Sequence, residues 1–267
     1  VYDFWFAMNN HVMGYPLKQY ACQVSAIAPL SENTYQVDLL APDDASLSYH
    51  AGQHLQLELN PEQEAGMQSL SYTIANACKP DSPQRLQLII HKNSDFSGKI
   101  IKTLASLHHS KKSARVTLPL GKAYLQTRLD QPHVLVAAGS GIAKIKCIIE
   151  EIVNRKPDAD VTIYWSNRSV NDFYLLDFFQ RLESRYKTIT FIPVLESESA
   201  GWAGRSGYLY EVIQQDFASL EHTKMYLCGS PAMVYGTMDQ LKSRGLQEEH
   251  CYSDVFEYAP RLPQSEG

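Results

Sequence analysis

The stretch VLVAAGSGIAKIK, at residues 134–146, decides the fold of the C-terminal half of the chain. It begins as a short apolar run typical of a buried strand, passes through Gly139, Ser140 and Gly141, and continues with the apolar spacing of a helix. Glycines at such a junction allow a tight turn, and they also bring backbone N–H groups to a helix start, where an anion is favoured. The pattern GxGxxG is incomplete because residue 144 is lysine. The stretch alone leaves open an anion-binding loop and a plain strand–helix turn.

Strand-like and helix-like segments alternate on both sides of this stretch. The strand-like runs are HVLVAAG (133–139), VTIYWS (161–166), TITFIPVLE (188–196), KMYLCG (224–229) and a last run, CYSDVFEYA (251–259). A helix-like segment follows each of the first four runs. This alternation predicts an α/β domain over 133–267, with a parallel sheet covered by helices on both faces.

Residues 17–125 follow a different pattern. Short β-rich runs are separated by turn residues, and GQHLQLELN (52–60) alternates cleanly, with Leu55, Leu57 and Leu59 on one face. This spacing predicts an antiparallel sandwich or small barrel. One helix is expected from Ser94 or Asp95, with apolar residues at 100, 101, 104 and 107. The polar run 126–132 is predicted as a linker, and residues 1–16 as a tail outside the fold.

Composition excludes several classes of function. The net charge is −5 and the sequence has no dense Lys/Arg stripe, which argues against a nucleic-acid partner. No run approaches the roughly 20 apolar residues of a membrane span. The five cysteines are scattered without C-x-x-C spacing, so we expect no metal site, no iron–sulfur centre and a reducing, cytoplasmic setting.

The ends of the predicted parallel strands carry small and polar residues. Because open parallel sheets bind ligands at the carboxyl ends of their strands, these positions predict a binding crevice. A flat ligand such as a nucleotide could approach the backbone closely there. The positions are Gly139, Ser140 and Gly141; Asn167 and Arg168; Cys228, Gly229, Ser230 and Pro231; and, near the last run, Phe256 and Tyr258.

Several ordered motifs resemble one family. YHAGQHLQLEL, LSYTIAN, LPLGKAYL, AAGSGIA, GWAGRSGYL, YLCGSPAMV and SDVFEYA occur in the order and spacing of the ferredoxin–NADP reductase superfamily. The resemblance covers roughly residues 18–259 and is nearest to stand-alone bacterial NAD(P)H:flavin reductases. It implies a flavin-binding antiparallel β-barrel, followed by a nicotinamide-nucleotide domain, with the flavin between them.

The resemblance also implies roles in the barrel. Tyr72 would pack against the flavin ring, and the Thr73 hydroxyl would hydrogen-bond the flavin N5. Leu70 departs from the family pattern, which has an arginine there that anchors the flavin. Leucine offers no donor or charge, so we predict loose flavin binding unless another group compensates. The other expected flavin contacts are Ser71, Ile90, His91, Lys92, Ser97, Gly98 and Lys99.

In the second domain, Cys228 resembles the family cysteine beside the nicotinamide C4. Thr73 and Cys228 are therefore the predicted catalytic residues. Arg168 without an acidic neighbour would accept a 2′-phosphate, which slightly favours NADPH over NADH. Alternation places Phe256 and Tyr258 on one side of a last strand, where one ring would cover the flavin.

The sequence thus predicts an NAD(P)H-dependent flavin reductase that transfers hydride from nicotinamide to flavin N5. Its cofactors would be FAD or FMN, loosely bound, with NADPH or NADH. Two alternatives remain: an FAD-containing reductase component that donates electrons to a protein partner or a ferric chelate, and a catalytically silent flavin- or nucleotide-binding module. The final acceptor and the oligomeric state are left open.

Overall fold

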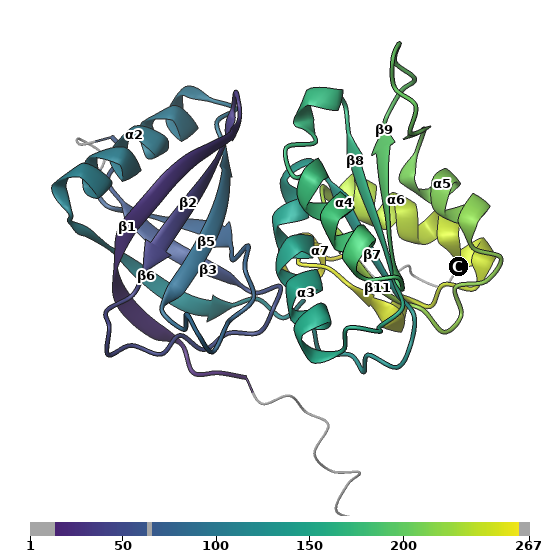
Figure 1. The fold of residues 1–267 in the computed structure, drawn as a ribbon, viewed down its shortest axis with the longest axis horizontal. Helices are drawn as coiled ribbons and strands as arrows, with labels where there is room; N and C mark the ends of the chain where they lie inside the picture. The colour runs from purple at the N-terminus through teal and green to yellow at the C-terminus, as the bar shows by residue number, and fades with distance from the viewer. Residues whose placement is uncertain (1–13, 63–65, 262–267) are drawn as a thin grey trace, which may run out of the picture.

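The computed structural model describes residues 14–62 and 66–261, so the predicted tail lies outside the described residues up to position 13. Two domains lie side by side, with helix α3 of the second domain facing the first (Figure 1). The predicted fold class is confirmed: a curled antiparallel sheet is followed by a parallel α/β sheet.

The first domain is a half-barrel of six antiparallel strands in the order β4-β3-β6-β1-β2-β5. β4 and β5 are therefore the two edges of the sheet, and they approach each other where Ala75 N donates to Gln87 O at 2.7 Å. The elements are β1 (Lys18–Ser31), β2 (Thr34–Leu40), β3 (His54–Leu59), β4 (Gln68–Thr73), β5 (Arg85–His91), α2 (Asp95–Ser110) and β6 (Ser113–Leu120).

The predicted alternation and helix cap are both confirmed. Leu55, Leu57 and Leu59 are all buried on one side of β3. Helix α2 begins after Ser94. The Ser94 hydroxyl accepts a hydrogen bond from Ser97 N, and the Ser97 hydroxyl accepts one from Ser94 N. This capping box satisfies N–H groups that the first helical turn leaves without partners.

The second domain is a six-stranded parallel sheet in the order β10-β9-β8-β7-β11-β12. Its strand order reverses between β7 and β11. Its elements are β7 (His133–Ala138), α3 (Ile142–Arg155), β8 (Val161–Asn167), α4 (Leu176–Arg185), β9 (Ile189–Leu195), β10 (Arg205–Ser206), α5 (Leu209–Asp216), β11 (Lys224–Cys228), α6 (Pro231–Leu241), β12 (Cys251–Tyr252) and α7 (Val255–Tyr258).

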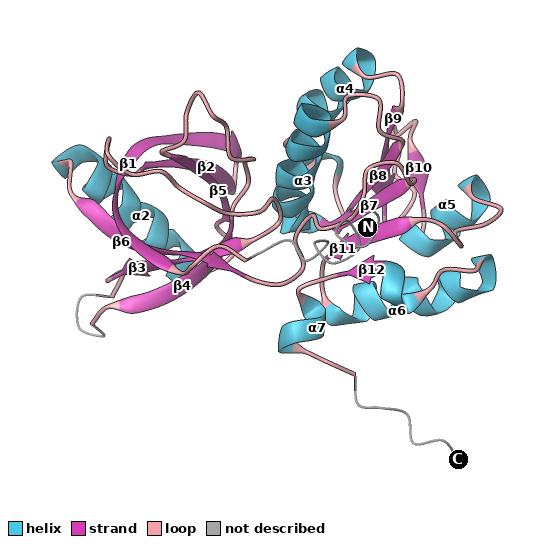
Figure 2. Ribbon diagram, turned by 90° about the horizontal axis from the view of Figure 1, so that it is seen from below, coloured by secondary structure: helices cyan, strands magenta, loops and turns pink. Residues whose placement is uncertain are grey.

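Helices cover both faces of this sheet, as expected (Figure 2). Leu135 and Ala137 of β7 belong to the cluster that contains α3 and α4, whereas Val134 and Val136 belong to the cluster that contains α5 and α6. The alternate residues of one buried strand thus supply two hydrophobic layers, which explains its unbroken apolar sequence.

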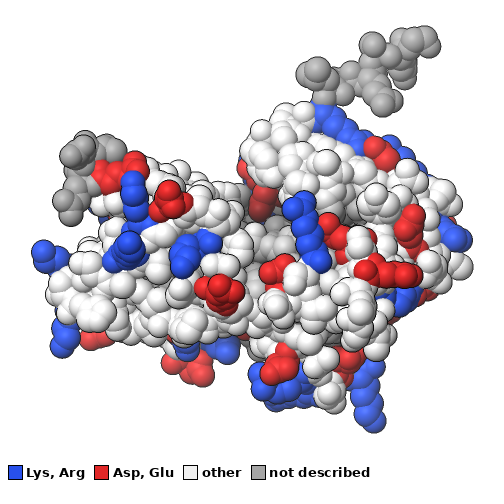
Figure 3. Space-filling view, turned by 90° about the horizontal axis from the view of Figure 1, so that it is seen from above, with Lys and Arg blue, Asp and Glu red and all other residues white. Residues whose placement is uncertain are grey.

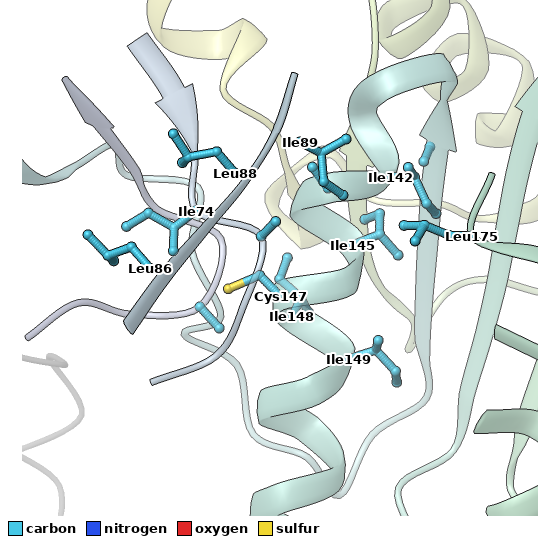
Figure 4. Close-up of a cluster of buried hydrophobic side chains, with 14 of the residues drawn as sticks. Ile74, Leu86, Leu88, Ile89, Ile142, Ile145, Cys147, Ile148, Ile149 and Leu175 are labelled. Atoms are coloured by element: carbon cyan, nitrogen blue, oxygen red, sulfur yellow. The ribbon is translucent and has the colours of Figure 1, made fainter. Parts of the chain in front are cut away.

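One hydrophobic cluster continues from the barrel into the second domain. Figure 4 shows Cys147 and Ile148 on the side of α3 toward Ile74 of the barrel, and Ile145 on the side toward Leu175, all within one cluster. The connection between β6 and β7, which contains the predicted linker, also packs: Leu125 and Leu129 are buried.

The prediction of a last strand through Phe256 and Tyr258 is wrong. The strand ends at Tyr252, and residues Val255–Tyr258 form a short helix. The buried Ser253 causes the change, because its hydroxyl accepts from Val255 N at 3.3 Å and its carbonyl accepts from Phe256 N at 3.3 Å. A serine that bonds the backbone in this way starts a helical turn.

Lysine, arginine and acidic side chains are interspersed on the face seen in Figure 3, and none forms a long stripe of one sign there. Among the described residues, no helix is both long enough and apolar enough to cross a bilayer.

Candidate functional site

A cleft of about 1040 Å³ lies at the carboxyl ends of the parallel strands. Its wall includes Gly139 and Ser140 after β7, residues 166–168 at the end of β8, and Ser230 at the start of α6. His91 and Asn93 from the end of β5 also line it, so the cleft reaches from the second domain to the barrel. This first cleft lies where the strand order reverses, the usual ligand position in open α/β sheets.

Gly139 and Gly141 are required to be glycine for two different reasons. Gly139 adopts a φ of 54°, and a Cβ there would meet open space, so the turn requires glycine while leaving the cleft clear. Trp165 fixes this turn by donating its indole N–H to Gly139 O at 2.9 Å. A Cβ on Gly141 would collide with the Cys228 carbonyl, so the second glycine lets α3 begin directly against β11.

The ends of β8 and β9 correct one premise of the cofactor prediction. Arg168 is highly exposed and has an acidic neighbour, because its Nε lies 3.3 Å from Glu196 Oε2. Asn167 is buried, and its carbonyl accepts from Glu196 N at 3.0 Å. All three residues line the first cleft, so a basic and an acidic side chain lie together in its wall.

Cys228 is the last residue of β11, shortly before α6, and it is half-buried. Burial raises the pKa of its thiol to about 11, although the nearby Lys144 cation acts in the opposite direction. The thiol is therefore protonated at neutral pH. Gly229 follows it, Ser230 caps α6 by accepting from Met233 N at 3.2 Å, and Pro231 occupies the first turn.

A second cleft, of about 480 Å³, lies between β4 and the C-terminal segment. Six residues line it: His54, Ser71, Thr73, Asp254, Glu257 and Tyr258. Thr73 is paired directly with His54 across β4 and β3, so the two lie on the same side of the sheet. Tyr72 lies on the other side of β4, where it packs against the core, and burial raises its pKa to about 12.

His54 is surrounded by charged groups. Burial lowers the pKa of its imidazole and Lys144 lowers it further, while Asp254 and Glu257 act to raise it. The net direction is downward, so His54 is neutral at neutral pH.

The predicted flavin contacts near α2 are already engaged elsewhere. Ser97 N donates to the Ser94 hydroxyl and Gly98 N donates to the Ser94 carbonyl, so both N–H groups take part in the helix cap. Lys99 pairs with exposed Glu62 at 2.7 Å. Three other predicted flavin contacts lie on or just after β5. Ile90 is buried, His91 Nδ1 lies 2.9 Å from Thr34 Oγ1, and Lys92 Nζ lies 6.0 Å from the centre of the Tyr35 ring.

The helix at the C-terminus separates the two predicted aromatic residues. Tyr258 is 63% exposed and lines the second cleft. Phe256 packs near Tyr235 of α6, with ring centroids 5.8 Å apart. Tyr258 is therefore the ring that faces the cleft.

Sequence reasoning missed His54, Lys144, Glu196, Asp254 and Glu257. Only Lys144 carried a signal, since it stands where the fingerprint has a small residue. The other four lie at the site only because the tertiary fold brings together segments that are far apart in the sequence. Among the described residues, no cluster of three or more His, Cys, Asp or Glu side chains is placed to hold a metal ion.

Comparisons with known proteins agree with this geometry. Residues 135–239 match the model of the oxidoreductase NAD-binding domain. The chain is 28% identical to the CDP-6-deoxy-L-threo-D-glycero-4-hexulose-3-dehydrase reductase of Yersinia pestis, over 90% of the chain and 69% of that protein. It is 23% identical to the NAD(P)H-flavin reductase of Aliivibrio fischeri, over 89% of the chain and 98% of that protein. A crystal structure of an Amycolatopsis cytochrome P450 reductase superposes with a TM-score of 0.77 at 25% identity, over 91% of this chain and 71% of that one.

A half-barrel joined to a parallel nucleotide-binding sheet, with clefts along the junction, defines a two-domain oxidoreductase. The matched domain model, these relatives and the shared two-domain fold together support an oxidoreductase that resembles the ferredoxin–NADP reductase superfamily.

Proposed function

We propose that this protein is an NAD(P)H-dependent flavin reductase that passes hydride from nicotinamide to flavin N5. The observation that carries the proposal is the placement of the two clefts. The first cleft runs from the strand ends of the second domain to His91 of the barrel, and the second holds Ser71 and Thr73 of the barrel against the C-terminal segment. The proposed domain limits are 17–125 for the flavin and 133–267 for the nucleotide, joined by 126–132.

The residues present fit both cofactors. Gly139 leaves open space at a helix start, where Gly139, Ser140 and Ser230 would hold the pyrophosphate. Ser71 and Thr73 present hydroxyl groups to the second cleft, where Thr73 would donate to or accept from the flavin N5 edge. When bound, the flavin supplies the hydride acceptor, and the protein supplies binding and orientation.

Cys228 and Tyr258 would control access to the flavin. The neutral thiol of Cys228 is small, so it allows close approach of the nicotinamide ring without adding a charge. Tyr258 faces the second cleft and would cover the flavin until nicotinamide displaces it.

The pair Arg168–Glu196 would recognise the adenosine half of the nucleotide. Glu196 can accept hydrogen bonds from ribose hydroxyl groups, and Arg168 can bind a 2′-phosphate. Because the two side chains already pair, Arg168 gives no reason to prefer NADPH over NADH. Both nucleotides are therefore compared in the assay below.

The test is an assay of flavin-stripped protein with NADH or NADPH and with added FAD, FMN or riboflavin. Turnover is measured as the loss of nicotinamide absorbance. We expect turnover that saturates with free flavin. No oxidation with any flavin, although the protein binds both ligands, would contradict the proposal and favour a silent binding module.

A second candidate is a reductase component that keeps FAD and donates electrons to a protein partner or a ferric chelate. It is supported by the likeness to a dehydrase reductase and to a cytochrome P450 reductase. A protein that retains its flavin through gel filtration, and oxidises NAD(P)H only when a ferric chelate or partner fraction is added, would favour this candidate.

A further inference from the structure

Lys144 on α3 is a buried cation that joins three separate segments. It is only 1% exposed, and its ammonium donates to Gly52 O at 2.7 Å in the barrel. The same ammonium donates to both carboxylate oxygens of Asp254, each at 2.8 Å. The barrel, the helix after the glycine turn and the C-terminal segment therefore meet at one side chain.

Stability alone is a weak reason for such a contact. Removing an ammonium from water is expensive, and apolar residues of similar size often replace a buried ion pair without loss of stability. The location of the pair suggests another reason. Asp254 is partly exposed and lines the second cleft, whereas Lys144 lies behind it.

The charge of Lys144 reaches other groups at this cleft. It lowers the pKa of His54 and that of Cys228, and Asp254 raises both. Within the part of the chain that the structure describes, Glu257 on α7 also acts to raise the pKa of His54, and Thr73 on β4 and Gly121 after β6 are close neighbours of the imidazole. A Cβ at Gly121 would lie only 2.7 Å from His54 Nδ1, so the imidazole is closely confined.

We propose that Lys144 is a positioning residue of the second cleft, which holds the Asp254 carboxylate against both domains and balances its charge beside the His54 imidazole. The cleft wall then carries a fixed, compensated charge next to Thr73. This arrangement belongs to the protein without its cofactors. Only its consequence, a flavin affinity insensitive to pH near neutrality, rests on the proposed function.

Lys146 provides a matched control on the same helix. It is also buried, donates to Ala75 O at 3.0 Å and pairs with Glu150 at 2.6 Å. It joins α3 to the barrel as Lys144 does, but it lines neither of the two clefts described above. A purely structural role would therefore give both lysines the same phenotype.

The experiment is an NMR pH titration of the histidine Cε1–Hε1 signals in flavin-free protein. The chain has nine histidines, and the His54→Gln variant assigns the His54 signal. In Lys144→Met we expect an upward shift of the His54 midpoint, because the cation is lost while both carboxylates remain. In Asp254→Asn we expect a downward shift, and in the double variant Lys144→Met/Asp254→Asn a return toward the wild-type midpoint. Lys146→Met should leave the midpoint unchanged.

An unchanged His54 midpoint in both single variants would overturn the proposal. So would equal shifts in Lys144→Met and Lys146→Met, since these would reflect a general loosening. If Lys144→Met does not fold, Asp254→Asn and the double variant decide, because the double variant leaves no unpaired charge at this position. A flavin affinity that stays pH-independent in Lys144→Met would remove the functional consequence but not the charge balance measured without flavin.

Discussion

At the scale of single residues, Leu70 is the clearest departure from the family pattern. It is half-buried on β4, opposite buried Leu57, and the two lysines among the expected flavin contacts, Lys92 and Lys99, contact Tyr35 and Glu62 instead. We expect Leu70→Arg to tighten flavin binding by roughly ten- to a hundredfold, since a charged hydrogen bond contributes about 1.5–3 kcal/mol. Fluorescence titration of FAD and FMN measures the change. Unchanged or weaker affinity would contradict the idea that Leu70 loosens binding.

Gly141 is constrained by packing. Its missing Cβ makes room for the Cys228 carbonyl, so Gly141→Ala must push α3 away from β11. We expect a loss of about 1–3 kcal/mol of unfolding free energy and weaker NAD(P)H binding. Gly98→Ala is the control, because a Cβ there meets only Lys92 side-chain carbons at 3.9 Å. Denaturant unfolding compares the two, and equal stability would show that the turn relaxes freely.

At the scale of elements, the short helix α7 assigns different roles to its two aromatic residues. We expect Phe256→Ala to cost roughly 1–3 kcal/mol of stability, because its half-buried ring packs near Tyr235. We expect Tyr258→Ala to leave stability within about 0.5 kcal/mol, because the ring is mostly exposed, and to change flavin and NAD(P)H affinities. Thermal unfolding and ligand titration measure both variants. The same phenotype in both would contradict this division.

The connection that leads into β7 makes stability depend on pH. His133 is buried, contacts Thr127 at 2.8 Å and Gln131 O at 2.8 Å, and burial lowers its pKa. The unfolded chain then binds more protons, so unfolding free energy rises with pH. We expect stability to fall as the pH drops through about 6.5, the ordinary histidine value, toward the lower folded-state pKa. His133→Gln should flatten this part of the denaturation profile; a profile as steep as that of the wild type would exclude His133 as the cause.

The sequence predicts the helices and strands better than it predicts the tertiary contacts between them. The strand alternation around Leu57, the cap at Ser94 and the glycine turn at 139–141 follow from local rules, and the structure contains all three. The last helix, α7, was not predicted from the sequence, because its residues alternate like those of a strand. The hydrogen bond that Ser253 accepts from Val255 N starts a helical turn instead. His54 and Asp254 could not be found by local rules, because 200 residues of chain separate them and the tertiary fold brings them to one cleft.

At the scale of the whole molecule, the two domains share a continuous interior. Apolar contacts between α3 and the barrel are reinforced by Lys146, which reaches Ala75 O, and by Glu150, which accepts from Ala77 N at 3.0 Å. An interface that continues the core couples the two halves, unlike the polar contact between domains that move freely. The clefts therefore lie along a boundary that resists opening.

This coupling predicts how the protein unfolds. We expect one calorimetric transition for the wild type, with equal calorimetric and van't Hoff enthalpies. Lys146→Met leaves Glu150 partly buried without its cation, which should cost about 3 kcal/mol and separate the transitions of the two domains. Lys156→Met is the control, because its pair with Asp158 lies on the surface and contributes little. Two transitions already present in the wild type would show that the shared core does not couple the domains, and an unaltered single transition in Lys146→Met would assign the coupling to the apolar contacts alone.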